Sequence, residues 1–135
     1  MMGRIMAIDF GMKRTGIAVT DELRLIASGL TTVLTKDLMA FLEDYFNKEK
    51  VEELVVGQPT HADGIPLPIE KNIQFFIEDF EIKFPEIQVK REDERFTSKM
   101  AFQTMIDGGL KRKKRRDKAT IDQVSATLIL QSYMH

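Results

Sequence analysis

Residues Arg4–Asp21 read RIMAIDFGMKRTGIAVTD, and the rest of the chain can be interpreted from them. Two apolar runs flank a polar corner at Gly11–Arg14, and this spacing predicts a β-hairpin. Both faces of the first run are apolar, which indicates a central strand covered on both sides. The run leads to Asp9, and a carboxylate there needs a partner because an uncompensated buried charge is costly. From this stretch alone, a turn that donates backbone N–H bonds to Asp9 and a catalytic site explain the residue about equally well.

The composition is that of an ordinary globular protein. The chain has 135 residues, of which 43% are hydrophobic and 30% charged, and this predicts a single domain over residues 1–135. Cysteine is absent, which excludes disulfides, thiolate zinc sites and a cysteine nucleophile. No apolar run approaches the roughly 18 residues of a membrane span. We therefore expect a cytoplasmic protein that has no membrane partner.

The charge is distributed unevenly along the chain. Lys111–Lys118, KRKKRRDK, carries seven cations and one anion, so the rest of the chain carries −7 within a total of −1. A charge run is usually a solvated loop, but six consecutive cations favour binding of a polyanion. We expect a mobile, nucleic-acid-binding loop here.

The rest of the chain alternates between strand-like and helix-like patterns. We expect an α/β fold with a mixed five-stranded sheet, in which three antiparallel strands are followed by two parallel ones, and helices on both faces. The elements expected after the hairpin are a strand over Arg24–Val33, a helix over Lys36–Asn47 capped by Thr35, a strand over Glu53–Gly57, a helix over Pro68–Lys83, a strand over Ile87–Arg91, a helix from Thr97 or Ser98 to Gly108–Gly109, and a helix from Thr120, with Gln123 at capping-box spacing.

Acidic residues occur at the ends of three predicted elements. Asp9 follows the first strand, Asp93 and Glu94 follow the fifth, and Asp122 lies at the start of the last helix. The carboxyl ends of the parallel strands share one edge of the sheet, where α/β sheets usually bind ligands. The acids could therefore meet at that edge. The alternative for Asp122 is a first-turn acid that only stabilises its helix.

Carboxylates that meet at one edge repel one another, so such a cluster implies a bound cation. With no cysteine and only two histidines, the available oxygen ligands favour Mg²⁺ or Mn²⁺. Such ions can activate water and stabilise the leaving oxygen of a phosphodiester. The predicted chemistry is that of a hydrolytic nuclease. Its phosphate-binding candidates are Lys13, Arg14, Arg95, Lys111, Arg112, Lys113, Lys114, Arg115 and Arg116.

Four ordered segments, AIDFGMKRTGIAVTD, VVGQP followed by ADG, DERFTS and IDQVSATLILQSYM, resemble the signatures of the YqgF family, also called RuvX. The resemblance spans nearly the whole chain. It implies a ribonuclease H-like fold and a nuclease that processes the 5′ end of pre-16S ribosomal RNA or resolves Holliday junctions. Its catalytic and metal-binding acids fall on Asp9, Glu94 and Asp122, with Asp93 as a reserve ligand. The loop QPTHA departs from the usual family sequence, which leaves its substrate contacts open.

Other functions remain open at this stage. The Asp-Phe-Gly hairpin also resembles the phosphate-binding hairpin of actin-like kinases, but those proteins need two such domains. A non-catalytic RNA-binding factor could use the basic segment and keep the acids for folding. The chain could act as a monomer or as a homodimer, and symmetric cutting of a four-way DNA junction would require the dimer.

Overall fold

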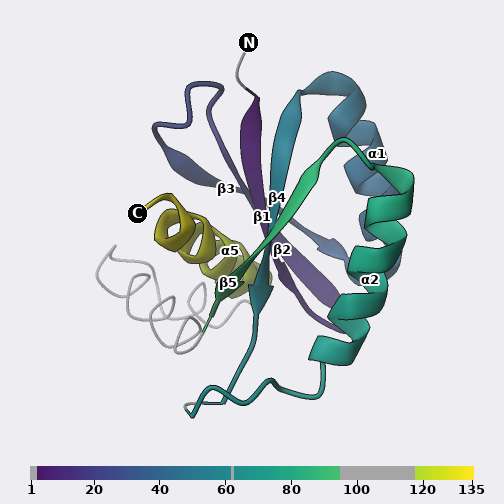
Figure 1. Cartoon of the computed structure of the whole chain (residues 1–135). Coiled ribbons are helices and arrows are strands. Elements are labelled where there is room, and N and C mark those ends of the chain that lie inside the picture. The colour runs from purple at the N-terminus through teal and green to yellow at the C-terminus, as the bar shows by residue number, and fades with distance from the viewer. Residues whose placement is uncertain (1–2, 62, 95–117) are drawn as a thin grey trace.

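The computed structural model describes residues 3–61, 63–94 and 118–135, which form one five-stranded sheet with helices on both faces (Figure 1). The strands lie in the order β3-β2-β1-β4-β5. In chain order the elements are β1 (Arg4–Phe10), β2 (Arg14–Thr20), β3 (Ala27–Leu34), the 3₁₀ helix η1 (Thr35–Asp37), α1 (Leu38–Lys48), β4 (Val51–Gln58), α2 (Glu70–Lys83), β5 (Gln88–Asp93) and α5 (Lys118–Met134).

The predicted sheet topology is confirmed. β1, β2 and β3 pair antiparallel, whereas β4 pairs parallel to β1 and β5 pairs parallel to β4. β1 is the central strand, and its residues Ile5–Ile8 are buried. The apolar character of both its faces follows from this position, because helices cover the sheet on each side.

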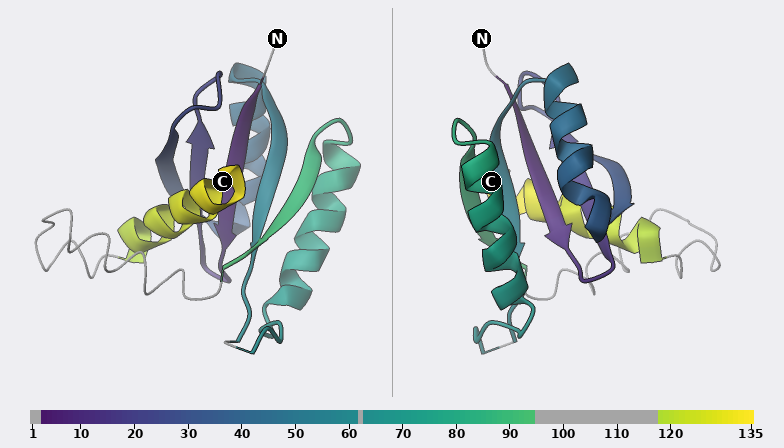
Figure 2. Two further views of the ribbon diagram at one scale, coloured as in Figure 1. Left: turned by 60° about the vertical axis from the view of Figure 1, so that its left-hand side comes forward. Right: turned by 90° about the vertical axis from the view of Figure 1, so that its right-hand side faces the viewer.

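The two faces of the sheet are covered by different helices. α1 and α2 lie on one face and α5 crosses the other (Figures 1 and 2). Met6 and Ile8 pack into the core under α1 and α2, while Ile5 and Ala7 pack against α5. Since successive strand residues point to opposite faces, Asp9 lies on the α5 side.

The third strand is shorter than predicted at its start. It begins at Ala27, and Arg24 lies in the preceding turn with a φ of 60°. The carboxylate of Asp21 accepts the backbone N–H groups of Leu25 and Ile26, at 2.7 and 2.9 Å. These bonds hold the chain in a turn that strand-like periodicity alone does not reveal.

Thr35 does not cap the first helix as predicted. η1 precedes α1, and neither helix has a side-chain cap bond. The hydroxyl of Thr35 instead donates to the backbone oxygen of Gly11 at 2.6 Å and lies 2.9 Å from the hydroxyl of Thr15. Thr35 therefore ties the hairpin corner to the end of β3.

The start of the last helix also differs from the prediction. The described part of α5 begins at Lys118, so Thr120 lies inside the helix and is not its cap. The helix predicted from Thr97 or Ser98 to Gly109 and the basic residues up to position 117 lie outside the described residues. None of the helices in the described part is long and apolar enough to cross a membrane.

Candidate active site

Three residues lie side by side across β2, β1 and β4 on the face that α5 covers. Asp9 pairs with Gly16 of β2, and Gly57 of β4 follows Val56, the partner of Ile8. Asp9 is therefore flanked by a glycine on each side. A glycine inside a strand often marks a place where another group approaches the backbone closely.

Each glycine leaves the space in which another predicted acid lies. A Cβ at Gly16 would collide with the backbone carbonyl of Asp122, and a Cβ at Gly57 would collide with Oε2 of Glu94. The two glycines thus allow α5 and the residue after β5 to approach the sheet on either side of Asp9. The structure brings the three predicted acids to one edge of the sheet.

Asp9 and Glu94 are in hydrogen-bond contact. Burial raises the pKa of Asp9 to about 6, against the opposing effect of the Glu94 bond, and the charge of Asp122 raises it further. Burial and the neighbouring charge of Asp9 raise the pKa of Glu94 to about 9. Because two buried carboxylates repel each other, the pair favours holding one shared proton over carrying two charges.

Asp122 acts on this pair through its charge and forms an ion pair of its own. Its Oδ2 lies 3.5 Å from Nε of Arg14, and both side chains are partly exposed. It is not in the first turn of the described helix, so stabilisation of that helix end does not account for it. Its contacts are instead with the hairpin that carries Asp9.

The donor chemistry of these residues fits a hard divalent cation. All the donors are carboxylate oxygens, which Mg²⁺ and Mn²⁺ prefer. Oε2 of Glu94 is buried and has no hydrogen-bond partner among the described residues, and a cation would satisfy it. As they stand, no three acidic or histidine side chains in residues 3–61, 63–94 and 118–135 enclose an ion position. The fit therefore rests on the Asp9–Glu94 pair, with Asp122 beside it.

Asp93 lies near Glu94, and its charge is one of the causes that raise the pKa of Glu94. It is exposed, and its Oδ1 accepts a bond of 3.3 Å from the hydroxyl of Thr60. Strand alternation places it on the opposite face of β5 from Glu94. Of the two neighbouring acids, the described structure therefore places Glu94 beside Asp9.

The sequence reasoning missed Arg91, which supports this edge from the other face. Its guanidinium donates to both carboxylate oxygens of Glu70 at 2.7 Å and to the backbone oxygens of Val56 and Gly57 at 3.1 Å. It thus fixes the end of β4 to α2. No sequence signal distinguished it, because an arginine is ordinary on a half-exposed strand.

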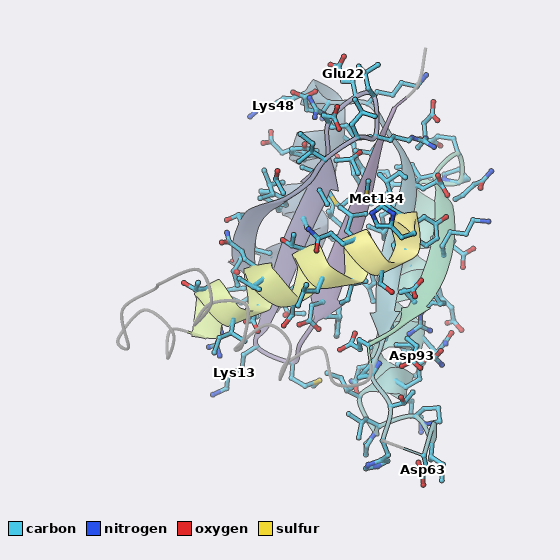
Figure 3. The ribbon with its side chains drawn as sticks, turned by 90° about the vertical axis from the view of Figure 1, so that its left-hand side faces the viewer. Lys13, Glu22, Lys48, Asp63, Asp93 and Met134 are labelled. Carbon is cyan, nitrogen blue, oxygen red and sulfur yellow. The ribbon has the colours of Figure 1, made fainter. Side chains whose placement is uncertain are left out.

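The predicted phosphate-binding residues are only partly described. Lys13 is exposed in the hairpin corner, and Figure 3 shows it at the same end of the molecule as Asp93, with Glu22 and Lys48 at the other end. Arg95 and Lys111–Arg116 lie outside the described residues.

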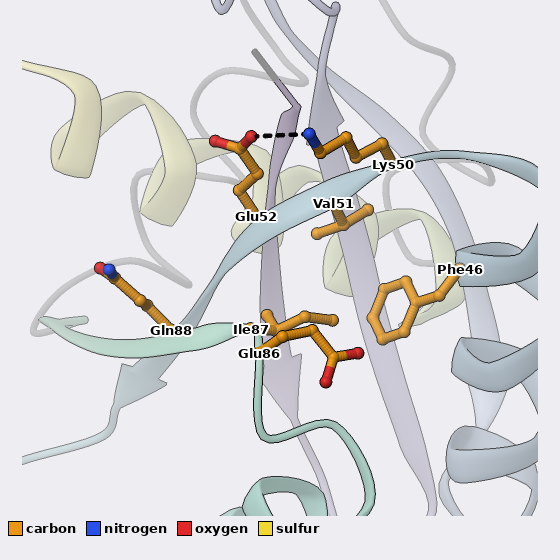
Figure 4. A pocket seen from close by; sticks show the side chains of 7 residues that line it. All are labelled: Phe46, Lys50, Val51, Glu52, Glu86, Ile87 and Gln88. Carbon is orange, nitrogen blue, oxygen red and sulfur yellow. Dashed lines mark ion pairs between the residues drawn. The ribbon is translucent and has the colours of Figure 1, made fainter. Parts of the chain in front are cut away.

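A hollow of about 460 Å³ lies at the opposite end of β4 and β5 (Figure 4). The ion pair of Lys50 and Glu52, 3.4 Å apart, lies at its rim. It is lined by residues at the start of both strands, including Val51 and Ile87. Since Asp9 and Glu94 lie at the carboxyl ends of their strands, this hollow is separate from the acids.

A family model and several known proteins match nearly the whole chain. The family model described as "RuvX: Holliday junction resolvase" matches residues 3–135. A protein of Christiangramia forsetii named "Putative pre-16S rRNA nuclease" is 61% identical over 99% of each chain. A protein of the same name from Flavobacterium psychrophilum is 55% identical over 98% of this chain and 97% of its own.

Two solved structures share the fold. The Fowlpox virus resolvase, in complex with Holliday junction DNA, has a TM-score of 0.60 at 13% identity and covers 97% of this chain and 96% of its own. RuvC of T. thermophilus, also with a Holliday junction substrate, has a TM-score of 0.58 at 15% identity and covers 98% and 96%. These neighbours support the predicted ribonuclease H-like fold. From the family match and the identity to its relatives, the chain belongs to the RuvX family and is a nuclease, a hydrolase that acts on ester bonds.

Proposed function

We propose that this nuclease hydrolyses a phosphodiester bond at the sheet edge where Asp9, Glu94 and Asp122 lie, and that its substrate is the 5′ region of pre-16S ribosomal RNA in the cytoplasm. The observation that carries the site assignment is the buried contact between Asp9 and Glu94. Two carboxyl groups forced together away from water are costly unless they share a proton or a cation. Buried carboxyl groups that are unfavourable for folding, at the carboxyl ends of the strands, are typical of a functional site.

Asp9, Glu94 and Asp122 would hold Mg²⁺ or Mn²⁺ at this edge. When bound, such an ion polarises the phosphate and makes a hydroxide nucleophile available near neutral pH. A proton shared by Asp9 and Glu94 must be released before both carboxyls can act as anionic ligands. Arg14 positions Asp122 at this edge: its Nε lies 3.5 Å from Oδ2 of Asp122.

The cations would hold the substrate backbone. Lys13 is exposed in the hairpin corner that follows Asp9, and an exposed lysine can neutralise a phosphate without reading the base. Arg95 and the basic residues Lys111–Arg116 would extend this contact along the polyanion. Because such contacts read charge and not the sugar, they leave both RNA and DNA as possible substrates.

RNA is the first choice because the relatives at 61% and 55% identity are named for pre-16S rRNA. The family description favours a second candidate, a Holliday junction in DNA. Symmetric cutting of that junction requires two active sites related by a two-fold axis. The oligomeric state on each substrate therefore helps to distinguish the two.

The test is a cleavage panel with a matched substitution. Wild type, Asp9→Asn and the control Asp79→Asn, which changes an exposed acid of α2, are incubated with pre-16S 5′ leader RNA and with a four-way DNA junction. Each reaction contains Mg²⁺, Mn²⁺ or a chelator. We expect metal-dependent cleavage of the RNA by wild type and Asp79→Asn, and a loss of at least about a hundredfold in Asp9→Asn, with RNA binding retained.

Each result decides a separate part of the proposal. Cleavage of the junction alone would replace the RNA substrate with DNA. Equal cleavage by Asp9→Asn would overturn the site assignment. RNA binding without cleavage by any of the proteins would leave a non-catalytic RNA-binding factor.

A further inference from the structure

A second hollow lies beside the hairpin corner. It has a volume of about 360 Å³ and is lined by Met12, Lys13, Arg14, Leu34 and Lys36. This volume is within the range of small-molecule sites. Arg14 also pairs with Asp122, so the hollow adjoins the proposed catalytic edge.

Hydrogen bonds fix the walls of this hollow in place. Thr35 donates two hydrogen bonds to the hairpin corner. Its backbone N–H donates to the backbone oxygen of Lys13 at 2.8 Å, and its hydroxyl donates to the backbone oxygen of Gly11 at 2.6 Å. The corner that carries Met12 is therefore tied to the segment that carries Leu34 and Lys36. A preformed site loses less entropy when it binds a ligand.

The lining combines apolar surface with positive charge. Met12 is 63% exposed and Leu34 is 50% exposed, although both are large hydrophobic side chains. Lys13 and Lys36 are exposed as well, and within residues 3–61, 63–94 and 118–135 neither has an ion-pair partner. A ligand that suits these walls has a flat, apolar part attached to an anion.

We propose that this hollow binds one unpaired nucleotide of the substrate next to the scissile phosphate. Its base packs on Met12 and Leu34, and its phosphate is neutralised by Lys13 and Lys36. This inference rests on the proposed function, and it specifies that the strand is unpaired next to the cut. A base within a duplex is stacked between its neighbours and cannot enter such a hollow, whereas an unpaired base can pack on side chains.

The first experiment measures binding without cleavage. In the Asp9→Asn background, RNA is labelled with the fluorescent base 2-aminopurine at successive unpaired positions around the cut. We expect one position to change its fluorescence on binding. Leu34→Asp weakens binding of the RNA roughly tenfold, because base–side-chain packing contributes about 1–3 kcal/mol per base. It weakens binding of an RNA with an abasic nucleotide at that position less, because there the new carboxylate only repels the phosphate and removes no base packing.

The matched control is Leu23→Asp. Leu23 is 66% exposed and lies in the β2–β3 turn, at the end of the sheet away from the acids. This variant introduces the same charge at an apolar site that is also exposed, so we expect unchanged binding. Thermal melts show whether Leu34→Asp folds. Met12→Ala, at the exposed corner, is a second variant, and we expect it to reduce the change in 2-aminopurine fluorescence on binding.

The outcomes separate this inference from the proposed function. If wild type cleaves the RNA but Leu34→Asp and Met12→Ala bind the intact and the abasic RNA like wild type, the hollow holds no base and the inference is wrong. If Leu34→Asp weakens both RNAs equally, the hollow binds only phosphate, which also overturns the inference. If wild type cleaves neither RNA nor DNA, the proposed function fails, while the fluorescence assay still decides the binding question.

Discussion

Oε2 of Glu94 lies over the backbone of Gly57, in the space that a side chain would need. Gly57 is at the end of β4 and Glu94 directly follows β5. The backbone N–H of Glu94 donates to the oxygen of Gln58 at 3.2 Å, which continues the pairing of the two strands. Glu94 can therefore occupy this position only because the residue beside it in β4 is a glycine.

Gly57→Ala tests this dependence directly. The added Cβ would collide with Oε2 of Glu94 and lie 2.7 Å from Cδ1 of Ile129, so the glutamate must move away from Asp9. A displacement of about 1 Å at a catalytic group can cost roughly a hundredfold in rate. We expect a loss of this size in the cleavage rate constant, measured in single-turnover assays with saturating enzyme.

Gly29→Ala is the control for that substitution. Gly29 also lies in a strand under α5, but the nearest atom to its Cβ would be Oγ1 of Thr127 at 3.3 Å. A side-chain oxygen at that distance can shift slightly, so we expect stability within about 1 kcal/mol of wild type and unchanged cleavage. A wild-type rate in Gly57→Ala would show that Glu94 does not need its present position.

Gly16→Ala should act on folding as well as on activity. Its Cβ would collide with the backbone carbonyl of Asp122, and a helix backbone cannot move aside by changing a rotamer. α5 must shift as a unit, which costs about 1–3 kcal/mol of unfolding free energy by analogy with overpacked cores. Urea unfolding measures this change. Stability equal to wild type would mean that α5 is not held against β2 at this point.

The sequence predicted the sheet because its signals are local. The two apolar faces of Arg4–Phe10 report burial under helices on both sides, and the short connections around β2 allow only antiparallel neighbours. The predicted helix over Pro68–Lys83 is present as α2 and buries Ile73, Phe76, Ile77 and Phe80. Each of these signals lies within one segment of the sequence, as the spacing of its apolar residues or the length of the connection to the next strand, so no contact between distant segments is needed to interpret it.

The details of the site depend on contacts between distant segments. Gly16 and Gly57 flank Asp9 because of the strand register, which the periodicity of the sequence does not reveal. A glycine inside a predicted strand was nevertheless a signal that another group approaches the backbone there. Strict strand alternation put Asp93 on the same face as Ile87 and Val89, and it was the family resemblance that selected Glu94. Glu94 is the one placed beside Asp9. The role of Arg91 requires the α2–β5 contact itself.

The raised pKa of Glu94 predicts how stability depends on pH in the metal-free protein. The folded pKa is about 9 and the ordinary value is 4.5, so between these values the folded state holds a proton that the unfolded state has lost. The unfolding free energy must then fall as pH rises, by at most about 1.4 kcal/mol per pH unit. Asp9 contributes in the same direction below about pH 6.

Urea unfolding in a chelator between pH 6 and 9 measures this slope. This range lies above the titration of Glu52 and Glu70, whose pKa values are lowered, so those acids do not mask the effect. Glu94→Gln should remove most of the slope, because glutamine cannot lose the proton. An equal slope in Glu94→Gln and wild type would refute the shared proton.

Arg91→Met tests the support of the sheet edge from the α2 side. The substitution leaves Glu70, whose side chain is only 14% exposed, without the partner that lowers its pKa, and it removes the donor to the oxygens of Val56 and Gly57. Hydrogen bonds to charged groups contribute about 1.5–3 kcal/mol each. We expect a loss of about 2–3 kcal/mol at pH 7, measured by urea unfolding.

The comparison with an exposed ion pair makes this last prediction specific. Lys48 and Asp44 form a pair at 3.1 Å with side chains 70% and 68% exposed, and Lys48→Met should cost no more than about 0.5 kcal/mol. The lowered pKa of Glu70 means that the Arg91 pair stabilises the fold above the ordinary pKa of 4.5 and loses this effect as pH falls further. The difference between wild type and Arg91→Met should therefore shrink in acid. A difference that stays constant down to pH 3 would indicate that Arg91 acts through its backbone contacts and not through Glu70.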